Sequence, residues 1–91
     1  MHEASLMNDL MRKIEAVARE QNARRILGIR VQLGALSHMS AGHFREHFAM
    51  ASRGTVAEGA ELNIDVLTDT SDPHAQEILL ESLQIADDSP K

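Results

Sequence analysis

The chain has 91 residues, a formal net charge of −5 and a pI near 5.4, and it contains no cysteine. This length allows one domain with a modest core. The acidic balance argues against nucleic-acid binding, because there is no basic excess to displace counterions from phosphates. Without cysteine the chain can form no disulfide, no thiolate zinc site and no thiol catalyst. Any metal site must therefore use nitrogen and oxygen ligands.

The sequence shows no sign of a membrane segment or of an enzyme. No apolar run approaches the roughly 20 residues that span a bilayer. The opening letters MHEASLMNDL carry acid where a signal peptide would carry basic charge. There is no P-loop, no nucleophile elbow and no glycine-rich dinucleotide motif. We therefore expect a cytoplasmic protein without catalytic activity.

The first predicted element is a helix from about Glu3 to Gln21. Its apolar residues recur at spacings of three and four, which is typical of an amphipathic helix with one buried stripe. Asn22 follows, and asparagine readily takes the left-handed conformation that ends a helix. Methionine usually fills irregular gaps in a core, so we expect the methionines of the stripe to be packing residues rather than metal ligands. The stripe consists of Leu6, Met7, Leu10, Met11, Ile14 and Val17.

A strand is expected over residues 25–33, where apolar and more polar residues alternate. Gly34 interrupts this pattern, and Ser40 can cap a second helix. We expect that helix to end near Arg53, with Gly54 as its stop. The apolar face of the strand consists of Leu27, Ile29, Val31 and Leu33, and that of the second helix of Phe44, Phe48 and Ala51.

The last third of the chain predicts two more strands. Residues 61–67 alternate around Leu62, Ile64 and Val66, and residues 78–85 are again rich in aliphatic side chains. Between them the letters TDTSDPHAQ predict a polar turn. The order is helix, strand, helix, strand, strand. The simplest architecture that buries all these stripes is an α+β fold with two helices packed on one face of a small three-stranded sheet.

The start of the chain offers a metal chelate. Methionine is removed only ahead of small residues, so a chain with His2 should keep Met1 and its free α-amine. That amine, the amide nitrogen of His2 and the Nδ1 atom of His2 can close chelate rings around one ion, and the amide of Glu3 can complete a square. Such a nitrogen set suits Ni(II) or Cu(II) better than Zn(II) or Mg(II). Taken alone, a histidine at position two is a weak signal, because it arises by chance in many proteins and an unused terminus is the simpler interpretation.

Three segments of the chain resemble the HypA/HybF family of hydrogenase and urease maturation proteins. The first is MHEASLMNDLMRKIEAVAREQNARRILGIRVQLGALS, where that family begins MHE-x-S-L and continues through an amphipathic helix into a strand ending IGxLS. RGTVAEGAELNIDV is similar to the family's segment after the second helix, and EILLESLQI to its closing strand. The resemblance covers nearly the whole chain in the family's order.

This resemblance implies a metallochaperone that carries Ni(II). Its implied partners are the HypB-type GTPase, the large subunit of a nickel-iron hydrogenase and, in some bacteria, urease maturation factors. On the family pattern Met1 and His2 hold the ion, and Glu3 contributes its backbone amide, with its carboxylate accepting hydrogen bonds from groups around the ion. The alternative is a metal-independent docking module that binds a hydrogenase subunit or the maturation GTPase.

The chain departs from the family pattern in one large way. Members normally insert two CxxC pairs between the last two strands to hold a structural zinc ion, whereas here residues 68–77 form only a short turn. We therefore expect no zinc, a nickel-binding domain over residues 1–86, and a disordered tail over residues 87–91. A natural degenerate paralogue and an engineered deletion would both give this pattern.

A second candidate metal site lies in the second helix. His43 and His47 are four residues apart, a spacing that lets two imidazoles share a metal ion. The sequence is not an HExxH motif, because Phe44 follows His43. A solvated helix face is the simpler interpretation, so the two histidines are retained only as a candidate low-affinity accessory site.

Overall fold

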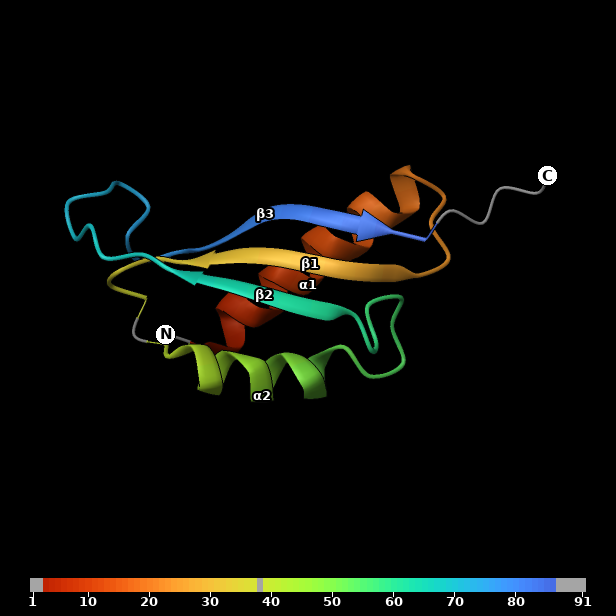
Figure 1. Cartoon of the computed structure of the whole chain (residues 1–91), viewed down its shortest axis with the longest axis horizontal. Coiled ribbons are helices and arrows are strands. Elements are labelled where there is room, and N and C mark those ends of the chain that lie inside the picture. Colours follow the sequence, from red (N-terminus) through yellow and green to blue (C-terminus); the bar gives the residue numbers. More distant parts are fainter. Residues whose placement is uncertain (1–2, 38, 87–91) are drawn as a thin grey trace.

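The computed structural model describes residues 3–37 and 39–86. Within these ranges two helices and three strands form one layered unit, with α1 behind the sheet and α2 beside β2 (Figure 1). The predicted α+β class and element order are confirmed. The elements are α1 (Glu3–Glu20), β1 (Ile26–Leu33), α2 (Ala41–Ala51), β2 (Glu61–Val66) and β3 (Ile78–Ile85).

Helix α1 is amphipathic and buries one stripe against the sheet. Ile14 is fully buried at 0% exposure, and the helix ends where Asn22 takes a left-handed φ of 54°. The predicted stop is therefore confirmed. Val17 is only half-buried, and the small Ala18 at 2% exposure takes its place in the core, because 3.6 residues per turn bring position 18 under Ile14. The buried stripe consists of Met7, Leu10, Met11, Ile14 and Ala18.

Strand β1 is the centre of the sheet, whose order is β2-β1-β3. It pairs parallel with β2 and antiparallel with β3. A parallel pair needs a crossover connection, which α2 provides between β1 and β2. Val31 and Leu33 on this strand are 0% exposed. The central strand of the sheet therefore also contributes fully buried side chains to the hydrophobic core.

The pairing of β1 with β3 is irregular at two places, and one of them overturns a prediction. The register shifts between Ile26 and Gly28, so that Ile26 is 1% exposed while Leu27 is 41% exposed. The prediction that Leu27 belongs to the apolar face is wrong, because an extra residue in the strand shifts the alternation of side chains by one position.

Helix α2 is fixed by a cap at its start and by aromatic packing. Ser40 is the N-cap, and its Oγ atom accepts a hydrogen bond from the backbone N–H of His43 at 3.1 Å. Losing such a cap costs about 1 kcal/mol. Phe44 and Phe48 are 0% and 4% exposed, with ring centres 6.1 Å apart. These two rings hold α2 against the core, and the opposite helix surface stays in solvent.

The far end of α2 and the outer edge of β2 depart slightly from expectation. The helix ends at Ala51 rather than near Arg53, because Ser52 caps it with its N–H on the carbonyl of Phe48 at 2.9 Å. Val66, which alternation assigns to the apolar face, is 57% exposed as the last residue of an edge strand.

Arg45 covers part of the unpaired edge of β2. Its Nη1 atom donates a hydrogen bond to the carbonyl oxygen of Leu62 at 3.1 Å. Edge strands expose unpaired backbone groups that invite pairing with another chain. The contact therefore satisfies one of these groups from the neighbouring helix, and nothing in the sequence pattern pointed to it.

The segment 67–77 packs onto the end of β1. The N–H of Gly34 donates to the carbonyl of Glu77 at 2.9 Å, and that of Leu36 to the carbonyl of Ala75 at 2.7 Å. A Cβ atom on Gly34 would lie 2.1 Å from the carbonyl oxygen of Ala75. Only glycine lets the two backbones approach this closely.

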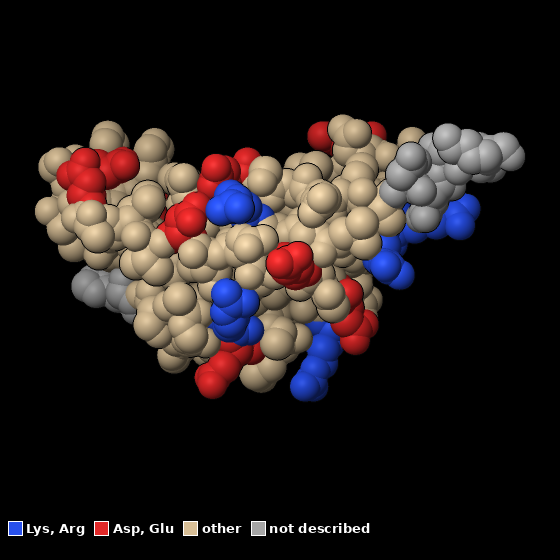
Figure 2. All heavy atoms as spheres, viewed as in Figure 1, with Lys and Arg blue, Asp and Glu red and all other residues tan. Residues whose placement is uncertain are grey.

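The sheet face that the helices leave uncovered carries dispersed charge. Figure 2 shows acidic and basic side chains interspersed on this side rather than one broad patch of either sign. Arg30 pairs with Asp65 at 3.4 Å between β1 and β2. Such a surface lacks the positive field that attracts nucleic acid. Neither helix in the described part of the chain is long and apolar enough to cross a membrane.

We predict that Gly34→Ala destabilises the fold by about 1–3 kcal/mol, the usual cost of overpacking. For a domain of this size that lowers the melting temperature by several degrees, about 4–8 °C per kcal/mol. The change in melting temperature is measured by thermal unfolding. The matched control is Gly42→Ala in the exposed first turn of α2, where an added Cβ meets nothing within 4 Å. That variant should be neutral or slightly stabilising, because alanine favours helix. Equal melting temperatures for the two variants would contradict the close approach at Gly34.

Candidate metal centre

The predicted nickel ligands belong to the start of α1. Met1 and His2 lie outside the described residues, and so does the side chain of Glu3. The backbone of Glu3 is described, and Glu3 is the first described residue of α1. Metal binding by Met1, His2 and Glu3 therefore stays a prediction.

The first residue of a helix has a backbone amide with special properties. The first four N–H groups of an α-helix have no acceptor within the helix. A metal ion can therefore replace the amide proton of Glu3 without breaking a hydrogen bond of α1. The same helix end carries about half a positive charge, which disfavours a bare dication. Two deprotonated amide nitrogens would cancel both charges of Ni(II), so the helix dipole would not oppose binding.

The two helices begin at the same end of the molecule. In Figure 1 the red first turns of α1 lie behind the start of α2, and the two helices are in contact. Met7 of α1 and Phe44 of α2 belong to one hydrophobic cluster. The packing thus brings the start of α1 and the first turns of α2 to one side of the core.

Histidines His43 and His47 form a stacked pair on α2. Their ring centres are 4.5 Å apart and their planes differ by 27°. His43 is exposed and His47 is half-buried. The predicted pair is therefore brought together. Among residues 3–37 and 39–86, however, no three or more histidine, aspartate or glutamate side chains are grouped so that they could hold an ion.

The turn at residues 67–77 is organised by its own polar side chains. Asp69 Oδ1 accepts hydrogen bonds from the N–H of Ser71 at 2.9 Å and from its hydroxyl at 2.6 Å. Asp72 Oδ1 accepts one from the N–H of His74 at 2.8 Å. The bonds from the Ser71 hydroxyl and N–H hold the pKa of Asp69 below its usual value, because they favour the charged carboxylate. These aspartates shape the turn.

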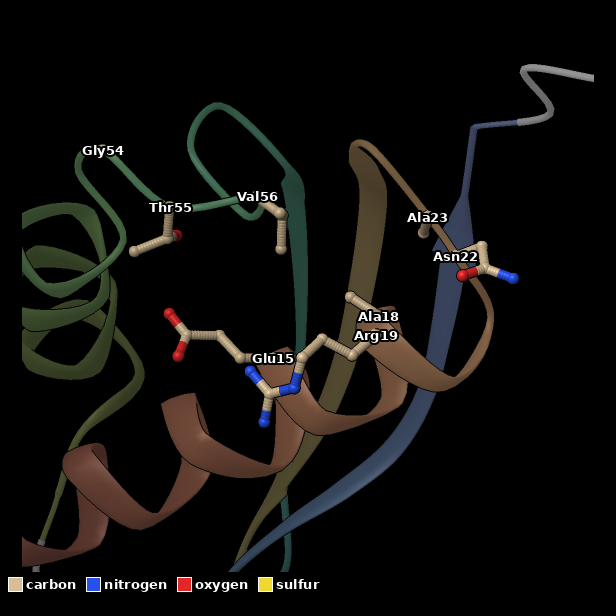
Figure 3. A pocket seen from close by; sticks show the side chains of 8 residues that line it. All are labelled: Glu15, Ala18, Arg19, Asn22, Ala23, Gly54, Thr55 and Val56. Carbon is tan, nitrogen blue, oxygen red and sulfur yellow. The ribbon is translucent and has the colours of Figure 1, made fainter.

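A hollow of about 550 Å³ lies between the end of α1 and the loop that follows α2. Figure 3 shows Glu15 and Arg19 projecting from α1 below this loop, with Thr55 and Val56 on the other side. One carboxylate and one guanidinium of opposite charge make a poor ligand set for a metal ion. We therefore do not assign a metal site to this hollow.

Comparison with known proteins decides the family. The family model described as "Hydrogenase/urease nickel incorporation, metallochaperone, hypA" matches residues 1–71. The chain belongs to the HypA family. The match ends inside the turn at 67–77, which is where the sequence resemblance indicates that the zinc-binding insertion of HypA proteins is missing.

Curated HypA relatives match at moderate identity. The hydrogenase maturation factor HypA of Methylocella silvestris is 42% identical over 67 residues, which is 74% of this chain and 59% of that protein. The HypA of Desulfitobacterium hafniense is 36% identical over the same length and the same shares of the two chains. The chain thus spans about three fifths of the length of these curated relatives.

The fold agrees with a solved HypA structure. The solution structure of the nickel metallochaperone HypA from Helicobacter pylori matches with a TM-score of 0.76 at 20% identity, covering 93% of this chain and 97% of that chain. At this identity the likeness establishes the fold alone. It covers the same arrangement of two helices on a three-stranded sheet.

Proposed function

We propose that this chain is a nickel-binding maturation chaperone that delivers Ni(II) to the large subunit of a nickel-iron hydrogenase, or to urease. Met1 and His2 hold the ion, and Glu3 contributes its backbone amide. The observation that carries the proposal is the family match over residues 1–71, which includes Met1, His2 and Glu3. The description of the HypA family, which names nickel incorporation, supports the same metal.

The donor set explains the choice of metal. An amine, an imidazole and deprotonated amides are nitrogen donors that favour a planar arrangement. Ni(II) accepts this geometry, whereas Mg(II) prefers six oxygen ligands and Zn(II) a tetrahedron. The chain has no cysteine to build a thiolate zinc site, and its turn at 67–77 uses its aspartates for local hydrogen bonds. We therefore propose nickel as cargo and no structural zinc.

A carrier must release its ion without unfolding. The core of this domain consists of apolar side chains from both helices and the sheet, with Ile14, Val31 and Phe44 all 0% exposed. None of these residues needs a metal to pack. Structural zinc sites, in contrast, supply folding free energy that is lost on release. The fold is therefore suited to load and unload an ion at its terminus.

The proposed partners follow from the family. The relatives are named hydrogenase maturation factors, and on this proposal the chain acts with a HypB-type GTPase and a hydrogenase large subunit, or with urease maturation factors. It acts by binding and transfer, not as an enzyme, and it meets these partners in the cytoplasm. Its net charge of −5 offers no basic surface for nucleic acid.

We predict that untagged protein with its native Met1 binds one Ni(II) per chain in a planar site. Titration followed by visible absorption should show a planar nickel band that disappears in His2→Ala. A Gly-Ser extension ahead of Met1 should also remove the band, because it converts the α-amine into an amide. His74→Ala is the matched control, since it removes an exposed imidazole from the turn at 67–77 and should leave the band unchanged.

The opposite outcome would favour the alternative function. If no planar nickel site forms, or if it is indifferent to His2 and to the extension, the chelate does not exist. The chain would then be a docking module that binds a hydrogenase subunit or the maturation GTPase without metal. Pull-down with those partners would remain unchanged in His2→Ala.

We further predict a steep pH dependence of nickel affinity. Each coordinated amide nitrogen must lose a proton, so two amides make the apparent affinity fall about 100-fold per pH unit on acidification. The loss should steepen below pH about 7.7–8.0, where an ordinary α-amine also begins to hold its proton. Equilibrium dialysis between pH 6.5 and 8.5 measures the slope. A change of tenfold or less per unit would rule out the amide ligands.

A further inference from the structure

We infer that His43 and His47 form a second transition-metal site on α2, which takes Ni(II) through two imidazole nitrogens. Its proposed ligands differ from those of the proposed chelate at the start of the chain. Imidazole is a suitable ligand for nickel as well as for zinc and copper.

The distance between the rings matches a shared ion. An imidazole nitrogen binds a divalent ion at about 2.0–2.1 Å, which puts the metal about 3.2 Å from the ring centre. Two such rings at a right angle around one ion have centres about 4.5 Å apart. The ring centres of His43 and His47 are 4.5 Å apart in the structure. In the structure the rings are stacked, with planes that differ by 27°, so binding one ion requires both side chains to rotate until their nitrogens converge.

The backbone that presents the pair is held rigidly. Ser40 caps the helix on the N–H of His43, and Phe44 and Phe48 anchor the next positions in the core. Each histidine therefore directly precedes a buried phenylalanine. Sites on a fixed helix hold their geometry better than sites on loops. The imidazoles do not have to be ordered by the metal from a flexible chain, which lowers the entropic cost of binding.

The surroundings of His43 and His47 determine the solvent access of the ion and its remaining ligands. His43 is exposed and His47 half-buried, so an ion can approach from solvent. Residues 3–37 and 39–86 contain no group of three or more histidine, aspartate or glutamate side chains that could hold an ion. We therefore propose a site of two imidazoles in which water takes the other positions. Two imidazoles with several waters give six-coordinate, paramagnetic Ni(II). That ion is spectroscopically different from the planar, diamagnetic ion of an amine and amide chelate.

The position of the α2 site could assist nickel loading at the start of the chain. The start of α1 and the first turns of α2 lie at the same end of the molecule (Figure 1). A weakly held, exchangeable ion on α2 would raise the local nickel concentration near the start of the chain. We therefore expect two nickel ions per chain at saturation, with different affinities and geometries.

The test uses the full chain with His2→Ala, so that the chelate at the terminus is disabled. Ni(II) is titrated into this protein by calorimetry and by NMR of the α2 amides. We expect one ion per chain and paramagnetic broadening centred on α2. Adding His43→Ala or His47→Ala should weaken binding by more than the roughly 10- to 100-fold that loss of an outer-shell partner costs. Adding His74→Ala should leave affinity and broadening unchanged.

Folding and the two nickel proposals can be separated in the same experiment. Alanine favours helix, so both α2 variants should keep the melting temperature of the His2→Ala protein. Nickel binding in the His2→Ala protein that is indifferent to His43→Ala and His47→Ala would overturn this inference, as would the absence of any binding. A wild-type protein without the planar band, but with nickel that depends on His47, would instead overturn the proposed chelate and leave this site standing.

Discussion

The packing of α1 behind the sheet, with α2 alongside β2, is the interaction on which the rest of this structure depends. Within residues 3–37 and 39–86, β1 is the only strand that pairs with both others, and its core-facing residues Val31 and Leu33 are fully buried. A domain of 91 residues without a disulfide has one core to rely on. Burial of apolar surface by α1 and α2 supplies its main stabilising free energy. The orientation of both helices follows from this packing.

The orientation of the two helices determines where the candidate metal sites lie. The stripe of α1 fixes the helix against the core, and the amides in the first turn of a helix lie outside its internal hydrogen-bond ladder. Phe44 and Phe48 fix α2 in the core, and the adjacent histidines are exposed at His43 and half-buried at His47. The proposed metal sites therefore lie at the margin of a core that consists of apolar side chains. This arrangement suits the proposed role as a nickel carrier.

The sequence predicted the features that depend on neighbouring residues. The cap at Ser40 and the left-handed stop at Asn22 follow from local backbone chemistry, and both were predicted correctly. The exposure of Leu27 was not, because a bulge arises from the pairing of two distant strands. For the same reason, no local pattern revealed that β1 pairs parallel with β2.

The candidate metal sites likewise have some features that the sequence shows and others that only the structure shows. The spacing of His43 and His47 was visible in the sequence, but the separation of their rings depends on side-chain rotamers and appeared only in the structure. The close approach at Gly34 required knowledge of where residues 67–77 return to the sheet. The roles of Met1, His2 and Glu3 still rest on the chemistry of their donors and on the family resemblance.

The most direct test of the central claim, that the start of this chain binds nickel without a zinc module, is nickel X-ray absorption spectroscopy on protein loaded with one equivalent of Ni(II). We expect a four-coordinate planar ion with nitrogen donors only, at a pH above 8. A six-coordinate ion surrounded mainly by oxygen, or an ion with a sulfur ligand, would contradict it.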